Sequence, residues 1–399
     1  MVDRRQRQMC IRDSSRTPGH PEHGHTPGVE TTTGPLGQGF ANAVGMALAE
    51  RFLAATYGAD VVDHYTYALA GDGCMMEGIS GEAASFAGHQ RLGKLIVLYD
   101  DNHITIDGST DLAFTEDVGK RFEAYGWHVL TVADGNDVDA VDAAITAAKA
   151  ETEKPSLIAV RTHIGYGSPS KQDKAAAHGA PLGADEVKLT KDACSWPLEP
   201  EFLVPDDVRE AFRAAGRRAA EAHAAWTEKY AAWRAADAAR AASWDAAWAR
   251  TLPDGWDADL PVFTTEDKLA TRAASGKVIN AVAPHLPTLM GGSADLAPSN
   301  NTLIKDEADQ QPATPAGRNV RWGVREHAMA AMGTGLALHG GVRPYVATFF
   351  VFTDLSLIHI SEPTRLLSIS YAVFCLKKQK PSTTTYNHQY IRITTRLHN

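Results

Sequence analysis

Strand-like and helix-like segments alternate along the chain from Thr32 to Ile164, and this alternation restricts the fold more than any other feature. The clearest strand is 94–99, Lys-Leu-Ile-Val-Leu-Tyr, and a second short apolar run, 65–70, ends at a glycine. Stretches with helical spacing of apolar residues lie at 39–56 and 77–91. Short runs that are apolar throughout, separated by helices, are typical of parallel sheets with helices on both faces. We therefore expect an α/β fold.

The segment 206–250 is of a different kind, because it is rich in alanine and carries four tryptophans at helical intervals. This pattern indicates helices that pack aromatic side chains onto a neighbour and connect two domains. A second α/β run follows. We expect helices at 271–283 and 325–339, and strands at 288–290 and 346–352.

Charge and cysteine content exclude several classes of protein. The 399 residues carry a formal net charge of −9, which disfavours binding of nucleic acid through a general basic surface. Four scattered cysteines do not make a disulfide framework, so we expect a cytoplasmic protein. No secretory signal is visible, and the apolar stretch 366–376 is shorter than the roughly 20 residues that a membrane-spanning helix needs. We expect no membrane partner.

The sharpest local signal is Gly71-Asp72-Gly73, directly after one predicted strand, with Asn102 directly after the next. Neighbouring strand ends would present carboxylate and amide oxygens to one point, and the glycines let the backbone come close to a ligand. Mg²⁺ prefers oxygen ligands and keeps substrate phosphates in its shell. An ordinary tight turn would explain Gly-Asp-Gly alone. Together with the strands and Asn102, the pattern favours a metal–diphosphate site.

Other motifs are weak when taken alone. Gly34–Gly39 precedes a helix, which suits a phosphate but also an ordinary turn with an N-cap. Glu326 would begin a helix, where glutamate is common because of the helix dipole. His163 and His178 are isolated, and an isolated histidine is more often structural than catalytic. Three histidines within 20–25 lack the cysteine or second histidine pair that a tetrahedral zinc site needs.

Taken together and in order, the motifs of this chain closely resemble those of the transketolase family, over about residues 15–354. The matching segments are His20-Pro21-Glu22, Gly28–Gly39, Gly71–Gly78, Tyr99–Asn102, His178–Pro181, Gly291–Ser299 and Val324–His327. Thiamine-diphosphate enzymes in general share only the Gly-Asp-Gly and Asn element, so this set is more specific. The resemblance implies a thiamine-diphosphate-binding fold and transfer of a two-carbon ketol unit between sugar phosphates, in the pentose phosphate pathway.

The resemblance also implies a role for each matching residue. Mg²⁺, with Ca²⁺ or Mn²⁺ as alternatives, would be held by Asp72, Asn102 and the carbonyl of Ile104. Thiamine diphosphate would contact Gly34, Pro35, Leu36, Gly73, Glu77, Glu82, Asn102, His178 and Phe352. The catalytic residues would be Glu326, His178 and His20, and the substrate would contact His20, Arg272 and Ser299. In the family, Glu326 hydrogen-bonds the aminopyrimidine ring, and Glu77 and Glu82 reach it across a homodimer interface.

The resemblance also predicts the domain organisation. We expect a non-family extension, a diphosphate-binding domain without its start, a helical linker, the first half of a pyrimidine-binding domain and a non-family tail. Their limits would be 1–14, 15–195, 196–260, 261–354 and 355–399. Both ends resemble translated sequencing adapter, and both carry an excess of Arg and Lys over acidic residues.

We therefore expect a fragment of a transketolase that is inactive or folds poorly, because the second sheet would be left with an exposed edge. Two alternatives stay open at this point. The chain could be a cofactor-binding subunit of a split thiamine-diphosphate enzyme, or it could belong to a ketol transferase similar to dihydroxyacetone synthase. The match over Gly34–Gly39 and His178–Pro181 argues against a third candidate, deoxyxylulose-phosphate synthase.

Overall fold

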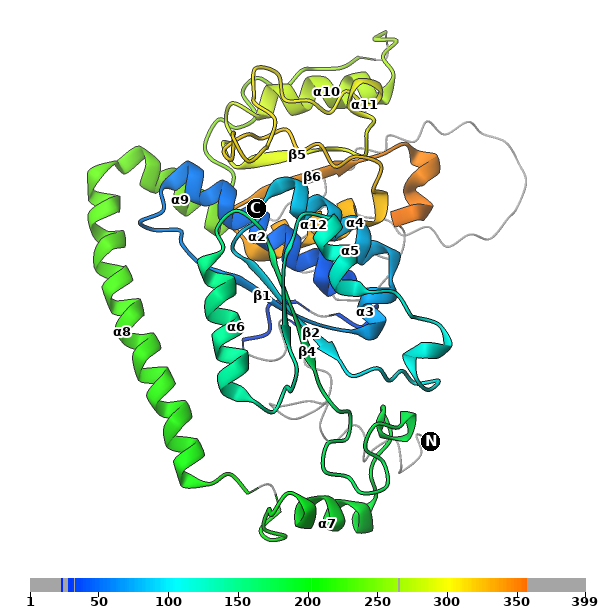
Figure 1. Ribbon diagram of the computed structural model, residues 1–399. Coiled ribbons are helices and arrows are strands. Elements are labelled where there is room, and N and C mark those ends of the chain that lie inside the picture. The colour runs from blue at the N-terminus through cyan, green and yellow to red at the C-terminus, as the bar shows by residue number, and fades with distance from the viewer. Residues whose placement is uncertain (1–22, 24–27, 32, 202, 265, 357–399) are drawn as a thin grey trace, which may run out of the picture.

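A parallel four-stranded sheet forms the centre of the first half of the chain (Figure 1). The computed structural model describes residues 23, 28–31, 33–201, 203–264 and 266–356. The strands lie in the order β1-β2-β4-β3, and every neighbouring pair is parallel. Their bounds are Thr66–Gly71 for β1, Leu95–Asp101 for β2, His128–Val132 for β3 and Ser156–Arg161 for β4. The predicted parallel sheet is confirmed.

Helices cover both faces of this sheet, which explains why β2, one of its two central strands, is apolar at every buried position. Alternate residues of β2 point to opposite faces, so Leu95 and Val97 join one core and Ile96 joins the other. The helices on the first face are α2 (Gln38–Tyr57), α4 (Gly78–Gln90) and α5 (Val118–Ala124). The second face is covered by α6 (Val138–Ala150). The short helix α3 (Asp72–Met76) and the turn η1 (Thr110–Leu112) follow β1 and β2.

The alanine-rich segment forms two helices, α8 (Asp206–Ala236) and α9 (Ala238–Ala249), and α8 descends along one side of the molecule in Figure 1. The tryptophans of these two helices pack on the first unit, as expected. The indole of Trp233 donates to the carbonyl of Tyr57 at 2.8 Å, and the ring of Trp244 meets that of Tyr57 edge-on at 5.2 Å. The linker is therefore packed onto the C-terminal end of α2. It is preceded by η2 (Ala175–Ala177) and α7 (Ala184–Ala193).

A second, smaller unit contains the parallel pair β5 (Leu289–Ser293) and β6 (Arg343–Ala347). Its helices are α10 (Thr271–Val282), α11 (Ala297–Asn300) and α12 (Glu326–His339). The two units are joined by close packing of α12 on α2. A Cβ atom built on Gly45 of α2 would lie 2.1 Å from the carbonyl oxygen of Met332, so the backbones touch without side chains between them.

One predicted strand is wrong over most of its length. We expected a strand at 346–352, but β6 ends at Ala347 and the 3-10 helix η3 (Phe350–Ser356) follows. The partner strand decides the end, because β5 stops at Ser293, which pairs with Ala347. Asp295 then takes a left-handed conformation, with φ 54°, so no ladder continues. An apolar, aromatic run needs a neighbouring strand before it can extend a sheet.

Some predictions fall outside the described residues. These are His20, the predicted extension 1–14 and the tail from 357 onward. Within the ranges that the structure describes, no helix is both long and apolar enough to cross a bilayer.

Candidate cofactor site at the carboxyl ends of the strands

The predicted metal ligands meet at the ends of two neighbouring strands. Gly71, the last residue of β1, is in register with Asp100 of β2, so Asp72 and Asn102 follow the two strands at the same edge of the sheet. The backbone N–H of His103 donates to Asp72 Oδ2 at 3.2 Å and ties the loop after β2 directly to the first residue of α3. The structure therefore places the loop 102–104 beside Asp72, and the assignment of Asp72, Asn102 and Ile104 as metal ligands stays a prediction.

Asp72 is a buried carboxyl group, only 4 % exposed. Its Oδ1 accepts a hydrogen bond of 2.6 Å from the hydroxyl of Tyr99. Burial raises the pKa of Asp72 above its usual range, and the nearby Asp101 carboxylate raises it further, whereas the Tyr99 hydrogen bond opposes the rise. A charge that is costly to bury becomes favourable when a cation lies beside it. A cation beside Asp72 would therefore stabilise its ionised form.

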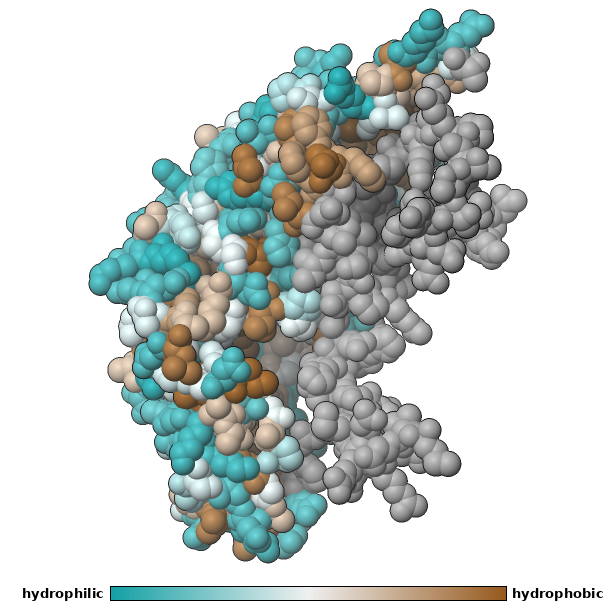
Figure 2. Space-filling model, turned by 90° about the vertical axis from the view of Figure 1, so that its right-hand side faces the viewer, coloured by the Kyte–Doolittle hydropathy of each residue, from teal (hydrophilic) through white to brown (hydrophobic). Residues whose placement is uncertain are grey.

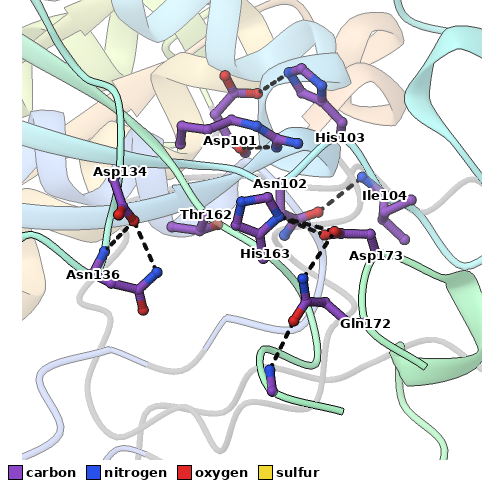
Figure 3. Close-up of polar contacts among 12 residues, drawn as sticks. Asp101, Asn102, His103, Ile104, Asp134, Asn136, Thr162, His163, Gln172 and Asp173 are labelled. Carbon is purple, nitrogen blue, oxygen red and sulfur yellow. Dashed lines mark hydrogen bonds and ion pairs between the residues drawn. The ribbon is translucent and has the colours of Figure 1, made fainter. Parts of the chain in front are cut away.

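The loop after β2 is closed by a bridge that leaves the backbone carbonyl of Ile104 unused. Ile104 and Ser109 form an isolated antiparallel bridge. The hydrogen bonds of this bridge run from Thr110 N to His103 O at 2.9 Å and from Thr105 N to Gly108 O at 2.7 Å. The bridge therefore does not use the carbonyl of Ile104. The Asn102 Oδ1 atom accepts from Ile104 N at 2.9 Å, which fixes the amide in the same loop (Figure 3).

The glycine-rich segment before α2 lies against the turn after β1. A Cβ atom on Gly73 would come within 2.7 Å of Leu36 Cδ1, and one on Gly37 within 2.9 Å of Glu77 Cβ. Thr33 stabilises the segment, since its hydroxyl accepts from Gly39 N at 3.2 Å. Four predicted cofactor contacts thus share one neighbourhood with Asp72: Gly34, Pro35, Leu36 and Gly73.

Glu82 of α4 contacts the beginning of α12, the helix that starts at Glu326. Its Oε2 accepts from the backbone N–H of Ala328 at 3.0 Å. The first N–H groups of a helix have no partner inside the helix, so this carboxylate caps α12. The contact lies within one chain, whereas the predicted network crosses a dimer interface; that crossing stays a prediction. Within the described ranges, no hydrogen bond or ion pair joins Glu326 to Asp72.

Replacing Glu82 by alanine is expected to remove the cap and to destabilise the protein by about 1 kcal/mol. The midpoint of thermal unfolding should fall by about 1–2 °C for a protein of this size. Glu82→Gln keeps an oxygen acceptor for Ala328 N and should lose less than half as much. If both variants have the same thermal midpoint as the wild type, the capping role is wrong.

In the described part of the chain, no hydrogen bond or ion pair joins Asp72 to the other predicted residues. His178 is exposed and follows η2, and Phe352 lies in η3, where its ring is 6.0 Å from that of Phe349. Arg272 and Ser299 are exposed on α10 and α11, two helices in mutual contact. The structure thus brings Arg272 and Ser299 to neighbouring elements but does not connect them to the metal-ligand group.

Several residues around Asp72 had no predicted role. Tyr99 donates to both Asp72 and Asp101, at 2.6 and 3.2 Å, and His103 pairs through Nε2 with Asp101 at 3.0 Å. The sequence signal was the run Tyr-Asp-Asp-Asn itself, whose alternation in a strand sends Tyr99 and Asp101 to the same face. Among the described residues, no group of three or more His, Cys, Asp or Glu side chains could hold a metal. The Asp72 set differs, because it combines one carboxylate, one amide oxygen and one carbonyl.

Comparison with known proteins identifies the family. The family model described as transketolase, thiamine diphosphate binding domain, matches residues 5–253, which is more than half of the chain. The chain belongs to the transketolase family. A second model, transketolase, pyrimidine binding domain, matches residues 267–384. The two matched ranges enter both predicted flanks, so the limits of the flanks stay predictions.

Individual relatives agree with this assignment. The chain is 54% identical to the transketolase of Halalkalibacterium halodurans over 343 residues, which is 85% of this chain and 51% of that protein. It is 54% identical to chloroplastic transketolase-1 of Arabidopsis thaliana over 346 residues, covering 85% and 47% of the two chains. The chain therefore spans about half the length of these transketolases.

Solved structures of transketolases share the fold. That of Leishmania mexicana superposes with a TM-score of 0.84 at 46% identity, covering 87% of this chain and 52% of its own. A Pichia stipitis transketolase in complex with sedoheptulose 7-phosphate also gives a TM-score of 0.84, at 44% identity and with coverages of 87% and 53%. The thiamine-diphosphate-binding α/β fold expected from the sequence is confirmed.

Proposed function

We propose that this chain is the cofactor-binding part of a transketolase, which transfers a two-carbon ketol unit from a ketose phosphate to an aldose phosphate. The observation that carries the proposal is the junction of Asp72 with the 102–104 loop at the edge of the sheet. Ligands of open parallel sheets bind at this edge. Family membership adds the identity of the ligand, thiamine diphosphate.

The residues at this edge suit a divalent cation, for which Mg²⁺ is the proposal and Ca²⁺ or Mn²⁺ the alternatives. Asp72 supplies a buried carboxylate, and its raised pKa means that a nearby positive charge would stabilise the ionised form. Asn102 has a second lone pair on Oδ1, and the Ile104 carbonyl is not used by its bridge. Three oxygens of these kinds are ordinary ligands of a hard cation, and the diphosphate would complete its shell.

The remaining roles follow from the family. Gly34, Pro35, Leu36 and Gly73 would line the cofactor, with Glu77 and His178 beside it and Phe352 on its pyrimidine ring. Glu326, supported by Glu82, would hydrogen-bond that ring, and a carboxyl group donates there only while it is protonated. Bound thiamine diphosphate supplies a carbon nucleophile and an electron sink. His20, Arg272 and Ser299 would bind the sugar phosphate, the class of ligand present in the complex of the Pichia stipitis enzyme with sedoheptulose 7-phosphate.

We further propose a cytosolic homodimer in the pentose phosphate pathway. Large apolar side chains are exposed on the loop after β2 and on η3, among them Ile106, Leu112, Phe350 and Val351. Both segments lie on the side of the molecule that Figure 2 presents, where apolar patches adjoin polar ones. Exposed apolar patches commonly mark protein interfaces. The predicted domain limits belong to the same proposal.

Isothermal titration of the 399-residue chain with thiamine diphosphate tests the proposed site. We expect binding that requires Mg²⁺ and is lost in EDTA, because the diphosphate is held through the metal. Thiamine without its diphosphate should not bind detectably. Binding of equal strength with and without a divalent cation would contradict the metal assignment. Sedimentation of the same sample measures the proposed dimer.

A further inference from the structure

A histidine and an aspartate close the loop that follows β4. His163 Nδ1 lies 3.0 Å from both carboxylate oxygens of Asp173, ten residues later in the chain. Asp173 has a left-handed backbone, with φ 56°, a conformation that L-residues other than Asn and Asp rarely adopt. We call this pair the clasp.

Further hydrogen bonds make the clasped loop a single unit. Asp173 N donates to Ile164 O at 3.0 Å, and Gln172 Nε2 reaches Asp173 Oδ2 at 3.4 Å. The other end of the Gln172 amide accepts from Gly167 N at 2.9 Å. Figure 3 shows His163, Asp173 and Gln172 in this arrangement. The carboxylate of Asp173 is therefore shared between the end of β4 and the far side of the loop.

The clasped loop carries the segment that contains His178. A Cβ atom on Gly165, inside the loop, would lie 3.0 Å from Cβ of Ala177, the residue before His178. Lys171, also inside the loop, donates through Nζ to Leu182 O at 2.9 Å and to Pro181 O at 3.2 Å. Contacts from the loop thus reach the chain on both sides of His178. The loop therefore supports the segment that carries this histidine.

The clasp stands at the same edge of the sheet as the proposed metal ligands. Asp101 of β2 is in register with Arg161 of β4, and Thr162 N donates to Asp101 O at 3.2 Å. The hydroxyl of Thr162 also bonds the Asp100 carboxylate. His163 therefore leaves the sheet beside the strand that leads to Asn102. The clasp fixes the His178 segment to the site edge rather than to a distant surface.

We propose that His163 and Asp173 are positioning residues that hold His178 beside the bound cofactor. The inference rests on the proposed function, because the role of His178 belongs to it. The clasp acts before any ligand arrives, by restricting the loop to one arrangement. Preorganisation of this kind lowers the entropic cost of ordering a loop around a ligand.

Hydrogen exchange of the chain without cofactor tests the structural half of the proposal. In His163→Ala and Asp173→Gly, amides of residues 174–183 should exchange about tenfold faster than in the wild type. Local opening of the loop in these variants no longer has to break the clasp, so its free-energy cost is lower. His163→Asn places an amide donor near the position of Nδ1, and Asp173→Asn keeps an acceptor and tolerates the left-handed backbone, so both should stay near wild type. His285→Ala is the matched control, because it breaks another His–Asp pair, 2.7 Å to Asp259, in the second unit.

Cofactor affinity in a double-mutant cycle tests whether the clasp acts through His178. Titration with thiamine diphosphate and Mg²⁺ should show binding about tenfold weaker in Asp173→Gly, with an unchanged thermal midpoint of the unliganded protein. In a His178→Ala background the same change should have no further effect. Fully additive losses, or unchanged exchange in both clasp variants, would overturn the proposal. A wild-type chain that binds no thiamine diphosphate would refute the proposed function, while the exchange measurement would still decide the clasp.

Discussion

Asp72→Asn is expected to weaken Mg²⁺-dependent binding of thiamine diphosphate by at least about 100-fold, because a neutral amide replaces the only carboxylate of the proposed ligand set. The fold should survive. The introduced amide would keep the hydrogen bond from Tyr99 and lose the one from His103 N, since an NH₂ group cannot accept. That loss is offset because no charge is buried. Isothermal titration measures the affinity, and calorimetry measures the thermal midpoint.

The stability difference between wild type and Asp72→Asn should depend on pH. Burial raises the pKa of Asp72 in the unliganded fold, so the stability that its protonated form contributes is present at low pH. It is lost as pH rises through the raised pKa, because the folded state then holds an unfavourable charge. The free energy of unfolding of the wild type, relative to that of Asp72→Asn, should therefore be highest in acid and lowest at neutral pH. At neutral pH, added Mg²⁺ should make the wild type more stable than the variant, because the cation stabilises the ionised carboxylate of Asp72.

Asp107→Asn is the matched control, because Asp107 is an exposed carboxylate in the same loop. It removes an equal charge without changing the proposed ligands, and it should bind the cofactor as the wild type does. Equal binding by wild type and Asp72→Asn would reject the metal assignment. Equal losses in Asp72→Asn and Asp107→Asn would show that only the general charge of the loop matters.

Gly45→Ala and Gly335→Ala are each expected to disrupt the junction between the two units. A Cβ atom on Gly335 would lie 2.0 Å from Asn42 O, and one on Gly45 would lie 2.1 Å from Met332 O. The obstacles are backbone atoms, so no side chain can rotate away and α2 and α12 must separate. Overpacking of this kind costs about 3 kcal/mol, more than alanine gains in helix propensity. We expect the thermal midpoint to fall by about 4 °C.

The double variant and a control make this prediction specific. Once one alanine has separated α2 from α12, the second should cost less, so the double variant should lose less than the sum. Gly216→Ala changes a glycine in the middle of α8 with no atom within 4 Å of the new Cβ. It should raise stability by about 0.5–1 kcal/mol. Thermal midpoints for Gly45→Ala and Gly216→Ala that change in the same direction would contradict the packing argument.

The central strands β2 and β4 could be predicted because burial on both faces makes them largely apolar. Ile96 and Val97 are both fully buried, although they point to opposite helical layers. The tryptophan pattern of the linker was equally informative. Side chains that pack on one neighbour lie on one face of a helix, so the helical spacing of the tryptophans predicted that they pack together on Tyr57 and its surroundings. The end of β6 could not be predicted, because it depends on where β5 stops and not on the residues 348–352 themselves.

The candidate site divides in the same way. The proximity of Gly71-Asp72-Gly73 to Asn102 was predictable, because the residues that follow neighbouring parallel strands lie at the same edge of the sheet. His163 and Asp173 were not, since only the fold of the loop brings an imidazole and a carboxylate ten residues apart into contact.

By itself, the sequence determined the alternation of strands and helices, the family and the residues at the ends of β1 and β2. These depend on local periodicity and on motifs that are contiguous in the chain. Only the tertiary structure decided that Glu82 caps α12, that α2 and α12 touch through Gly45 and Gly335, and that a clasp closes the loop after β4. The reason is physical: each of these contacts joins groups whose meeting depends on how the chain folds back on itself, and no local pattern records that path.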